Sequence, residues 1–300
     1  MLFLLCLCSI PLLVRSQVPT WWQENTQTLS RLRNVNFPDN TTGWIFGDSS
    51  DVTGFVTGII KKSVDQGQAW TSQNMGSNNF RVYSSYFFNI SSGVAVGRHQ
   101  VTGQGIVMLT ANGGTTWNTD SVSIPERLYD VDFSTNNIGW ICGRNGYLGR
   151  TNDGGNNWTP QNSGTAEHLF SLDFVDSTSG WAVGADPATG GTIVRTIDGG
   201  ATWTLQTNTV LNDLMAVYAF DQTKAIAVGI AGTIVMTSDS GNTWTPITSG
   251  TPEDLFDVTF TDQNHGGIVG PAGTILVSSA GGVTWMLQVG NPTTEIISIC

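Results

Sequence analysis

The sequence is poor in positive charge, and this shortage excludes several classes of function. Only 12 lysines and arginines stand against 23 aspartates and glutamates among 300 residues, which gives a formal net charge of −11. Proteins that bind nucleic acid or anionic membranes present a basic stripe to the phosphate groups. The arginines here are scattered, apart from a modest group at Arg98, Arg127, Arg144 and Arg150. The sequence therefore predicts neither nucleic acid nor an anionic membrane surface as a partner.

Cysteine and histidine are also scarce, with 4 and 3 residues in the whole chain. Cys6 and Cys8 fall in an apolar leader, which leaves Cys142 and Cys300 for the folded part and does not support a disulfide framework. No Cys-x-x-Cys or His-x-x-x-His spacing indicates a metal site. The sequence also has no nucleophile elbow and no phosphate-cradling loop. We therefore predict no catalytic residue, no metal and no cofactor.

Long hydrophobic runs are missing except at the N-terminus. Leu2 to Val14 is apolar but too short to span a bilayer comfortably, and no other segment resembles a membrane span. We predict that residues 1–16 are a signal peptide and residues 17–300 the folded domain, which makes the protein secreted or lumenal. Asn40 and Asn89 are then candidate glycosylation sites in exposed turns, whereas the similar triplet at Asn157 lies inside a hairpin.

One hairpin motif is abundant: it occurs six times with small changes, as in TIDGGATW at Thr196–Trp203. Its closing tryptophans recur every 41 to 47 residues, at Trp70, Trp117, Trp158, Trp203, Trp244 and Trp285. Its third position holds an acceptor side chain in five copies, at Asp65, Asn112, Asp153, Asp198 and Asp239, and Ala280 in the sixth. A period of this length is typical of one four-stranded blade of a β-propeller.

The chemistry of the motif predicts a structural role for each type of residue that recurs in its copies. The Asp or Asn side chain can accept backbone N–H groups inside the loop. The glycine that follows, such as Gly200, permits a positive φ that other residues resist. The tryptophan can bury a large ring between neighbouring blades. We therefore interpret these residues as determinants of the fold and not of catalysis.

The rest of each repeat indicates three short strands, as in Leu255–Phe260, Gly267–Gly270 and Thr274–Val277. No segment has a helical period, so the fold class is all-β with six complete repeats. Thr20–Gln23 matches a fourth strand and Ile296–Ile299 a first strand. We predict a seven-bladed propeller whose last blade is shared between the termini and truncated, in a chain that continues beyond this sequence. The alternative is a six-bladed ring in which the two flanking strands pair, since unpaired strand edges are avoided.

The hairpin motif, S/T-x-D-x-G-x-x-W, resembles the Asp-box or BNR repeat. The wider repeat is clearest at Leu169–Gln206 and Leu128–Gln161, and it resembles the photosystem II stability/assembly factor family of propellers. That resemblance implies a non-enzymatic scaffold that binds a protein partner. Members of the family help to assemble photosystem II by binding a reaction-centre precursor protein through an arginine-rich face. The acidic balance and plain secretory leader of this chain depart from that pattern, so the partner stays open.

A secreted sialidase-like or other glycoside hydrolase, or a carbohydrate-binding propeller, is the alternative. Sialidases share the Asp-box and use an arginine cluster, but the nearest match, Phe80–Tyr83, lacks their Arg-Ile-Pro motif. Arg150 and Arg195 precede Asp-box threonines, where a blade-face arginine is the simpler interpretation. We also find no convincing pair of carboxylates for glycoside hydrolysis.

Acidic and aromatic residues on the first strands are the remaining candidates for function. Asp130, Asp173 and Asp257 are predicted to line the central channel, where they could attract a cation or a basic peptide. The simpler alternative is that they accept hydrogen bonds from backbone groups near the strand ends. In the aromatic run Tyr83–Phe88, packing in the core explains most residues, and a protruding tyrosine could anchor a partner.

Overall fold

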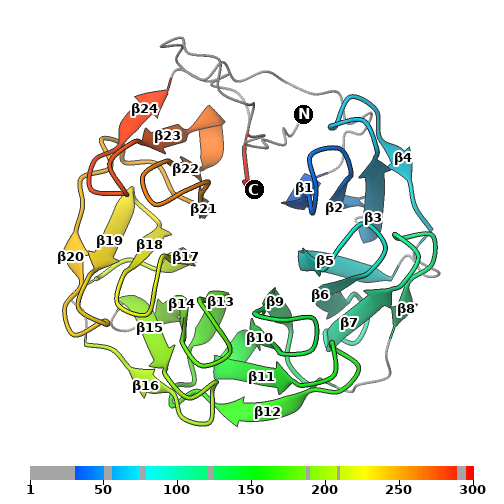
Figure 1. The fold of residues 1–300 in the computed structure, drawn as a ribbon, viewed down its shortest axis with the longest axis horizontal. Helices are drawn as coiled ribbons and strands as arrows, with labels where there is room; N and C mark the ends of the chain where they lie inside the picture. The colour runs from blue at the N-terminus through cyan, green and yellow to red at the C-terminus, as the bar shows by residue number, and fades with distance from the viewer. Residues whose placement is uncertain are drawn as a thin grey trace.

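The computed structural model describes residues 31–50, 56–74, 79–119, 124–186, 190–207, 210–288 and 295–300. Within them, six four-stranded antiparallel sheets are arranged around a central channel (Figure 1). Each sheet is built from four strands that follow one another in the chain, with the first strand at the channel and the fourth at the outer edge of the ring. The predicted all-β propeller with four-stranded blades is therefore confirmed. The leader and Thr20–Gln23 lie outside the described residues.

The strands of blades one to three have the following bounds: β1 (Arg31–Asn36), β2 (Gly43–Ser50), β3 (Val56–Ser63) and β4 (Thr71–Ser72); β5 (Phe80–Phe87), β6 (Gly93–His99), β7 (Gly105–Thr110) and β8 (Asn118–Thr119); β9 (Leu128–Phe133), β10 (Gly139–Gly143), β11 (Tyr147–Thr151) and β12 (Thr159–Asn162). Blades four to six contain β13 (His168–Phe174), β14 (Gly180–Asp186), β15 (Gly190–Thr196) and β16 (Thr204–Leu205); β17 (Leu214–Ala219), β18 (Ala225–Gly229), β19 (Thr233–Thr237) and β20 (Thr245–Pro246); β21 (Asp257–Phe260), β22 (Gly266–Val269), β23 (Ile275–Ser278) and β24 (Met286–Gln288). Two single 3-10 turns, η1 (Arg144–Gly146) and η2 (Pro271–Gly273), join second and third strands.

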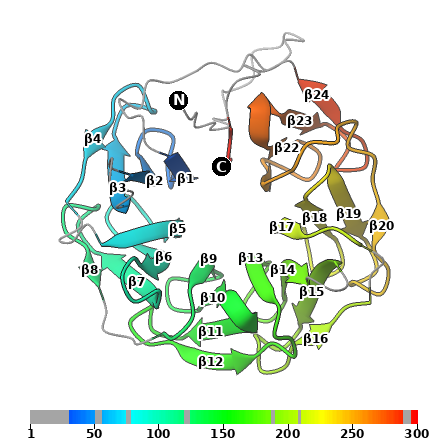
Figure 2. The same ribbon diagram turned by 180° about the vertical axis from the view of Figure 1, so that it is seen from behind.

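A seventh inner segment, Glu295–Cys300, lies between blades six and one (Figures 1 and 2). The Ile296 N–H donates to the Gly270 carbonyl at 3.0 Å, which repeats the 3.0 Å bond from Leu255 to Gly229 one blade earlier. Ile296 and Ile299 pack against blade six, and Cys300 packs against the apolar residues of blade one. This segment therefore occupies the place that the predicted first strand of a seventh blade would take.

The second strands show why the repeat requires glycine at both ends of its Gly-Trp-x-x-Gly pattern. In β14, a side chain on Gly180 would run into the ring of Phe174, and one on Gly184 would overlap the carbonyl oxygen of His168. Between them, Trp181 is fully buried. The two glycines let the first strand approach closely at both ends, and this contact sets the position of the channel wall.

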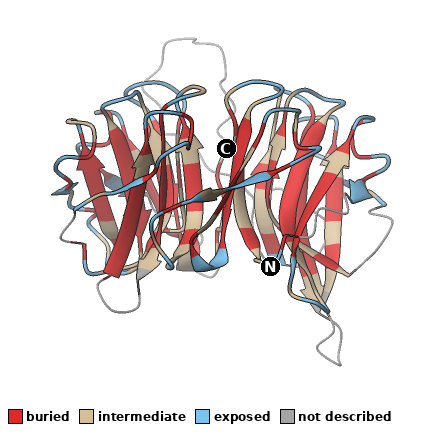
Figure 3. Cartoon of the chain, turned by 90° about the horizontal axis from the view of Figure 1, so that it is seen from below, coloured by how far each residue is buried: buried red, intermediate tan, exposed pale blue. Residues whose placement is uncertain are grey.

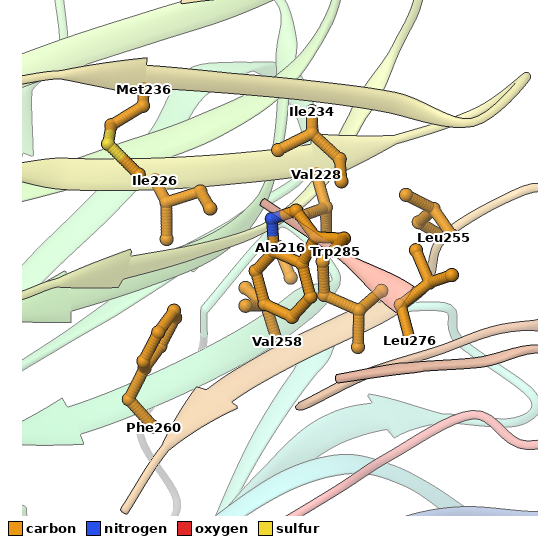
Figure 4. Close-up of a cluster of buried hydrophobic side chains, with 11 residues drawn as sticks. Ala216, Ile226, Val228, Ile234, Met236, Leu255, Val258, Phe260, Leu276 and Trp285 are labelled. Atoms are coloured by element: carbon orange, nitrogen blue, oxygen red, sulfur yellow. The ribbon is translucent and has the colours of Figure 1, made fainter. Parts of the chain in front are cut away.

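The hydrophobic core consists of layers between neighbouring blades. Figure 4 shows one such layer, in which Trp285 of blade six lies among Ile226 and Val228 of blade five and Val258 and Leu276 of its own blade. In blade four, Trp203 packs edge-on against Phe174 with ring centroids 5.8 Å apart. Buried residues follow the strands through the ring, and exposed residues gather on the loops at both faces (Figure 3). In blades two to six, the Asp-box tryptophan thus lies in a cluster that includes residues of the preceding blade.

The two faces of the ring carry different loops because the strands alternate in direction. Turns between first and second strands lie beside the Asp-box hairpins, as shown by the 2.8 Å bond from the Gly199 N–H to the Thr178 carbonyl. We call this side the Asp-box face. The first strands begin at the opposite face, together with the turns that follow second strands. The candidate site lies at that opposite face.

Candidate functional site at the mouth of the channel

The Asp-box hairpins satisfy their own polar groups. In blade four, Thr196 Oγ1 accepts the N–H of Gly200 at 2.8 Å, and Asp198 Oδ1 accepts the N–H of Thr202 at 2.8 Å. Hydrogen bonds from Thr202 lower the pKa of Asp198 below its usual range. Ser278 Oγ keeps the first of these contacts in the sixth hairpin, whereas Ala280 has no side-chain acceptor for the second. The geometry gives these residues a local, structural task.

Cationic side chains just before the hairpin attach each blade to the next. Lys62 Nζ donates to the Gly113 carbonyl at 3.1 Å and Lys224 Nζ to the Gly281 carbonyl at 2.9 Å, both in the following Asp-box. Arg195 lies over the ring of Trp181, 5.0 Å from its centroid, and donates to the Gln222 carbonyl at 2.7 Å. Arg150 lies over Trp140 in the same way. The two arginines that precede Asp-box threonines therefore lie in different blades, and Arg195 joins its blade to the next.

The channel aspartates are held by backbone N–H groups. Asp130 accepts the N–H of Val131 at 2.9 Å and that of Leu172, in the next blade, at 3.0 Å. Asp132 likewise accepts the N–H of Phe174 in β13, and Asp257 accepts the N–H of Ile299 in the seventh segment at 2.9 Å. Asp173 accepts the N–H of Ala219 at 2.6 Å. The carboxylates therefore connect neighbouring first strands around the channel.

These aspartates have raised pKa values because they are enclosed by protein. Their side chains are half-buried, and Asp130 and Asp257 line the cavity at the channel mouth. Burial raises the pKa of Asp257 to about 7, and burial together with the nearby Asp132 charge raises the pKa of Asp173. Within the described ranges, no group of three or more His, Cys, Asp or Glu residues could hold a metal ion.

A cavity of about 310 Å³ opens above the aspartates at the channel mouth. All seven inner segments contribute one large side chain to it from equivalent positions, and we call this ring the collar: Arg33, Tyr83, Tyr129, Phe170, Met215, Phe256 and Ile297. Tyr129 packs edge-on against Tyr83 at 5.6 Å and against Phe170 at 5.3 Å between ring centroids. The collar thus offers a mainly apolar and aromatic wall to whatever enters the channel.

β-bulges turn the collar side chains toward the cavity. In blade four, Leu169 pairs with Gly184 and Ser171 pairs with Val183, so Phe170 between them has no partner in the ladder. The same shift occurs around Arg33, Tyr83, Tyr129 and Met215 in their blades. Because a bulge re-aims the side chain that it bypasses, both Phe170 and the following Ser171 line the cavity.

Arginines gather beside the collar on blades one to three. We call this group the basic arc: Arg33, Arg81, Arg98, Arg127 and Arg144. Arg81 pairs across the ladder with Arg98, and the Arg144 N–H donates to the Arg127 carbonyl at 2.8 Å. Arg33 forms an ion pair with Asp48, which also lies 3.4 Å from Arg81 Nε. The buried Nε atoms of Arg98 and Arg127 have no hydrogen-bond partner among the described residues.

The basic arc contains the residues that reasoning from the sequence missed. The sequence indicated only a modest group of Arg98, Arg127, Arg144 and Arg150, and Arg33 and Arg81 were not grouped with them. The repeat alignment could have indicated part of it, because Arg31, Arg81 and Arg127 occupy the same repeat position, directly before Leu32, Val82 and Leu128. The protruding tyrosine of the aromatic run is Tyr83, which lies in the collar.

The candidate glycosylation sites lie on the Asp-box face, in the turns between first and second strands. Asn40 and Asn89 are exposed, and Asn89 Oδ1 accepts the N–H of Ser91 at 2.8 Å. The side-chain amide of Asn157 instead donates to Asp153 at 2.8 Å. Modification at Asn40 and Asn89 stays a prediction.

The fold and the hairpins define the class of this molecule as an Asp-box β-propeller. The family model described as photosynthesis system II assembly factor YCF48 matches residues 109–250, and the chain resembles that family over this part of the ring. No curated protein shows significant sequence similarity to the chain. Among the described residues, no helix is long and apolar enough to cross a membrane.

Solved structures show the same fold. The structure of YCF48 bound to D1 peptide has a TM-score of 0.67 at 19% identity, over 87% of this chain and 82% of that one. YCF48 from Cyanidioschyzon merolae has a TM-score of 0.66 at 18% identity, over 88% and 87%. The GH74 xyloglucanase from Xanthomonas campestris gives 0.60 at 13% identity, over 84% of this chain and 46% of that one.

Proposed function

We propose that the chain is a non-enzymatic binding propeller that assists the assembly of a protein complex, and that it holds an acidic segment of its partner at the channel mouth. One observation carries this proposal. A protein with a net charge of −11 and only 12 basic residues concentrates five arginines in the basic arc, of which Arg33 lines the cavity and Arg127 lies over the collar ring of Tyr129.

The chemistry of the basic arc suits carboxylate oxygens. Arginine presents planar donors that match a carboxylate, and a buried donor without an acceptor is costly. The Nε atoms of Arg98 and Arg127 are such donors. Asp48 supplies the only carboxylate that contacts Arg33 and Arg81 among the ion pairs of the described residues. A partner carboxylate would supply further acceptors, while the collar would cover its apolar neighbours.

The resemblance to the YCF48 family supports a protein partner. The solved relative is bound to D1 peptide, which indicates that a propeller of this shape can hold a peptide. We infer the same kind of ligand here, a peptide segment, without assigning its source. We also propose that residues 1–16 direct the protein to a lumenal or secreted compartment, which N-terminal sequencing of the mature protein would test by placing Gln17 first.

A binding titration tests the proposal. The probe is a fluorescein-labelled peptide of glutamate and alanine with a free C-terminus, titrated with the full chain and read by anisotropy. The double variant Arg81→Gln with Arg127→Gln should weaken binding by about tenfold or more, because charge-assisted hydrogen bonds contribute about 1.5–3 kcal/mol each. Arg150→Gln with Arg195→Gln is the control, since neither arginine lines the cavity and this pair of substitutions also removes two positive charges. Equal weakening in the double variant and the control would contradict the proposal.

A carbohydrate ligand is the second candidate, because the collar places aromatic rings above Asp130 and Asp257, whose carboxyl pKa values are raised by burial. Both carboxylates are already engaged by backbone N–H groups. We therefore expect no turnover of a fluorogenic sialoside or of a β-glucan. Turnover that disappears in Asp257→Asn, while the melting temperature is retained, would favour a glycosidase.

A further inference from the structure

The rim of the channel mouth is formed by one residue from each inner segment. This residue lies two positions before the collar residue of its segment, and the seven members are Arg31, Arg81, Arg127, His168, Asp213, Asp254 and Glu295. The first six occupy equivalent places, because the carbonyl oxygen of each one lies against the glycine at the end of the second strand in its own blade. Glu295 precedes Ile296, which repeats the backbone bond of Leu255.

Charge is divided around this rim. Blades one to three contribute arginine, blade four contributes His168, and blades five, six and the seventh segment contribute Asp213, Asp254 and Glu295. Glu253 adds an exposed carboxylate next to Asp254. Glu126 next to Arg127 and Glu167 next to His168 add two carboxylates on the other side. The mouth therefore has one half that is basic in net charge, continuous with the basic arc, and one half whose charged members are all acidic.

The two halves meet at two different boundaries. At one boundary Arg31 and Glu295 form a 2.8 Å ion pair, which closes the ring between the seventh segment and blade one. At the other, His168 Nδ1 accepts the N–H of Asn145 at 3.3 Å, so the ring is held by a loop of the neighbouring blade. In the acidic half, Asp254 Oδ1 accepts the N–H of Ala231 at 2.9 Å and is fixed in place. Among the described residues, no ion pair engages Asp213 or Glu253.

We propose that the acidic half of the rim is a second contact surface, which makes the mouth select a partner segment that is acidic at one end and basic at the other. The inference rests on the proposed function and extends it by naming the charge order of the ligand. The acidic end lies over blades one to three, and the basic end lies over Asp213 and Glu253. A uniformly acidic segment would meet the basic arc but would place like charge against blades five and six, which is unfavourable.

Two probe peptides of equal length distinguish these ligands. One has glutamates at one end and lysines at the other, and the second has glutamates at both ends, with identical neutral spacers and blocked termini. The inference predicts tighter binding of the mixed-charge peptide. The double variant Asp213→Asn with Glu253→Gln should weaken binding of the mixed-charge peptide by about three- to tenfold and strengthen binding of the all-acidic peptide, since exposed charges act through screened contacts of modest size.

A matched control separates local contact from net charge. Val64→Lys with Val283→Lys makes the same change in net charge at two exposed positions of the Asp-box face. If the control shifts both peptides as much as the rim variant does, or if the rim variant shifts both in the same direction, the inference is wrong. If the parent binds the all-acidic peptide at least as tightly as the mixed one, the inference also fails and the proposed function stands. If the parent binds neither peptide, the proposed function fails first.

Discussion

Trp203 shows how much of the ring depends on one side chain. Only 8% of it is exposed, its ring packs against Phe174, and its Nε1 donates to Gln161 at 3.2 Å. Trp203→Ala should lower the free energy of unfolding by about 3–5 kcal/mol, as truncations of large buried aromatics do. Urea unfolding measures this loss, with Thr204→Ala on the exposed strand β16 as the control. An unchanged midpoint would contradict the placement of Trp203 between two blades.

Asp198 and Ala280 offer a reciprocal test of the hairpin. Asp198→Ala removes the acceptor for the Thr202 N–H and should cost on the order of 1 kcal/mol, as loss of an exposed capping side chain does. Because the pKa of Asp198 is lowered by hydrogen bonds, its contribution is present above the unfolded pKa and is lost as the pH falls through the folded pKa. Ala280→Asp should stabilise by a similar amount. Thermal melts at neutral pH that move in the same direction for both variants would refute this assignment.

At the scale of the strand, the close approach of β13 and β14 gives a sharper prediction. Gly184→Ala would place a methyl group on the carbonyl oxygen of His168, which is backbone and cannot turn away. We expect a loss of several kcal/mol or failure to fold, since overpacking against backbone is costly. Gly149→Ala is the control, because its nearest neighbour would be a side-chain carbon of Ile141 at 3.0 Å. Similar unfolding midpoints for both variants would show that the strand can shift.

The strands also show what the sequence can and cannot reveal. The second strands were predictable because each is a short apolar run that ends in glycine, with a tryptophan near its start in blades one, three and four. The first strand of blade six was predicted as one alternating run, Leu255–Phe260, whereas the ladder of β21 begins at Asp257. Strict alternation would place Phe256 and Asp257 on opposite faces, yet both line the cavity. The alternation of apolar and polar residues does not indicate where a strand becomes irregular, so the sequence pattern could not predict the collar.

At the scale of the whole molecule, the complete basic arc was not predicted, because it depends on how the blades are placed around the ring. Arg33, Arg81 and Arg127 are separated by more than forty residues of sequence and come to the same face only because the first strands of neighbouring blades begin there. The repeat count and the blade order could be predicted, since each follows from local spacing. To predict which variable positions converge on the mouth, the register of every inner strand must be known.

The acids of the whole ring predict an unusual dependence of stability on pH. Burial raises the pKa of Asp257 to about 7, whereas backbone hydrogen bonds from Asn264 lower the pKa of Asp262 to about 2. The raised group stabilises fully below the unfolded value of about 4 and loses its contribution as the pH rises through about 7. The lowered group stabilises above about 4 and loses its contribution as the pH falls through about 2.

Stability should therefore be greatest in mildly acidic solution and decline between about pH 5 and 8. Urea midpoints across this range measure the decline. Asp257→Asn should flatten it, while Asp262→Asn should change only the acidic limb. A midpoint that rises steadily from pH 5 to 8 in the parent would contradict enclosure of the channel aspartates.

The collar position can vary without affecting strand pairing, because a bulge keeps the collar residue out of the ladder. Tyr129 and Phe170 are bypassed by the ladder, so the residue at this position takes no part in strand pairing or in the contact between paired glycines. Arg33, Met215 and Ile297 occupy the same place in other segments without altering the blade. Seven sites around one opening can thus change identity independently of folding. Ligand specificity could therefore change through substitutions at the collar alone, while the fold of the ring is kept.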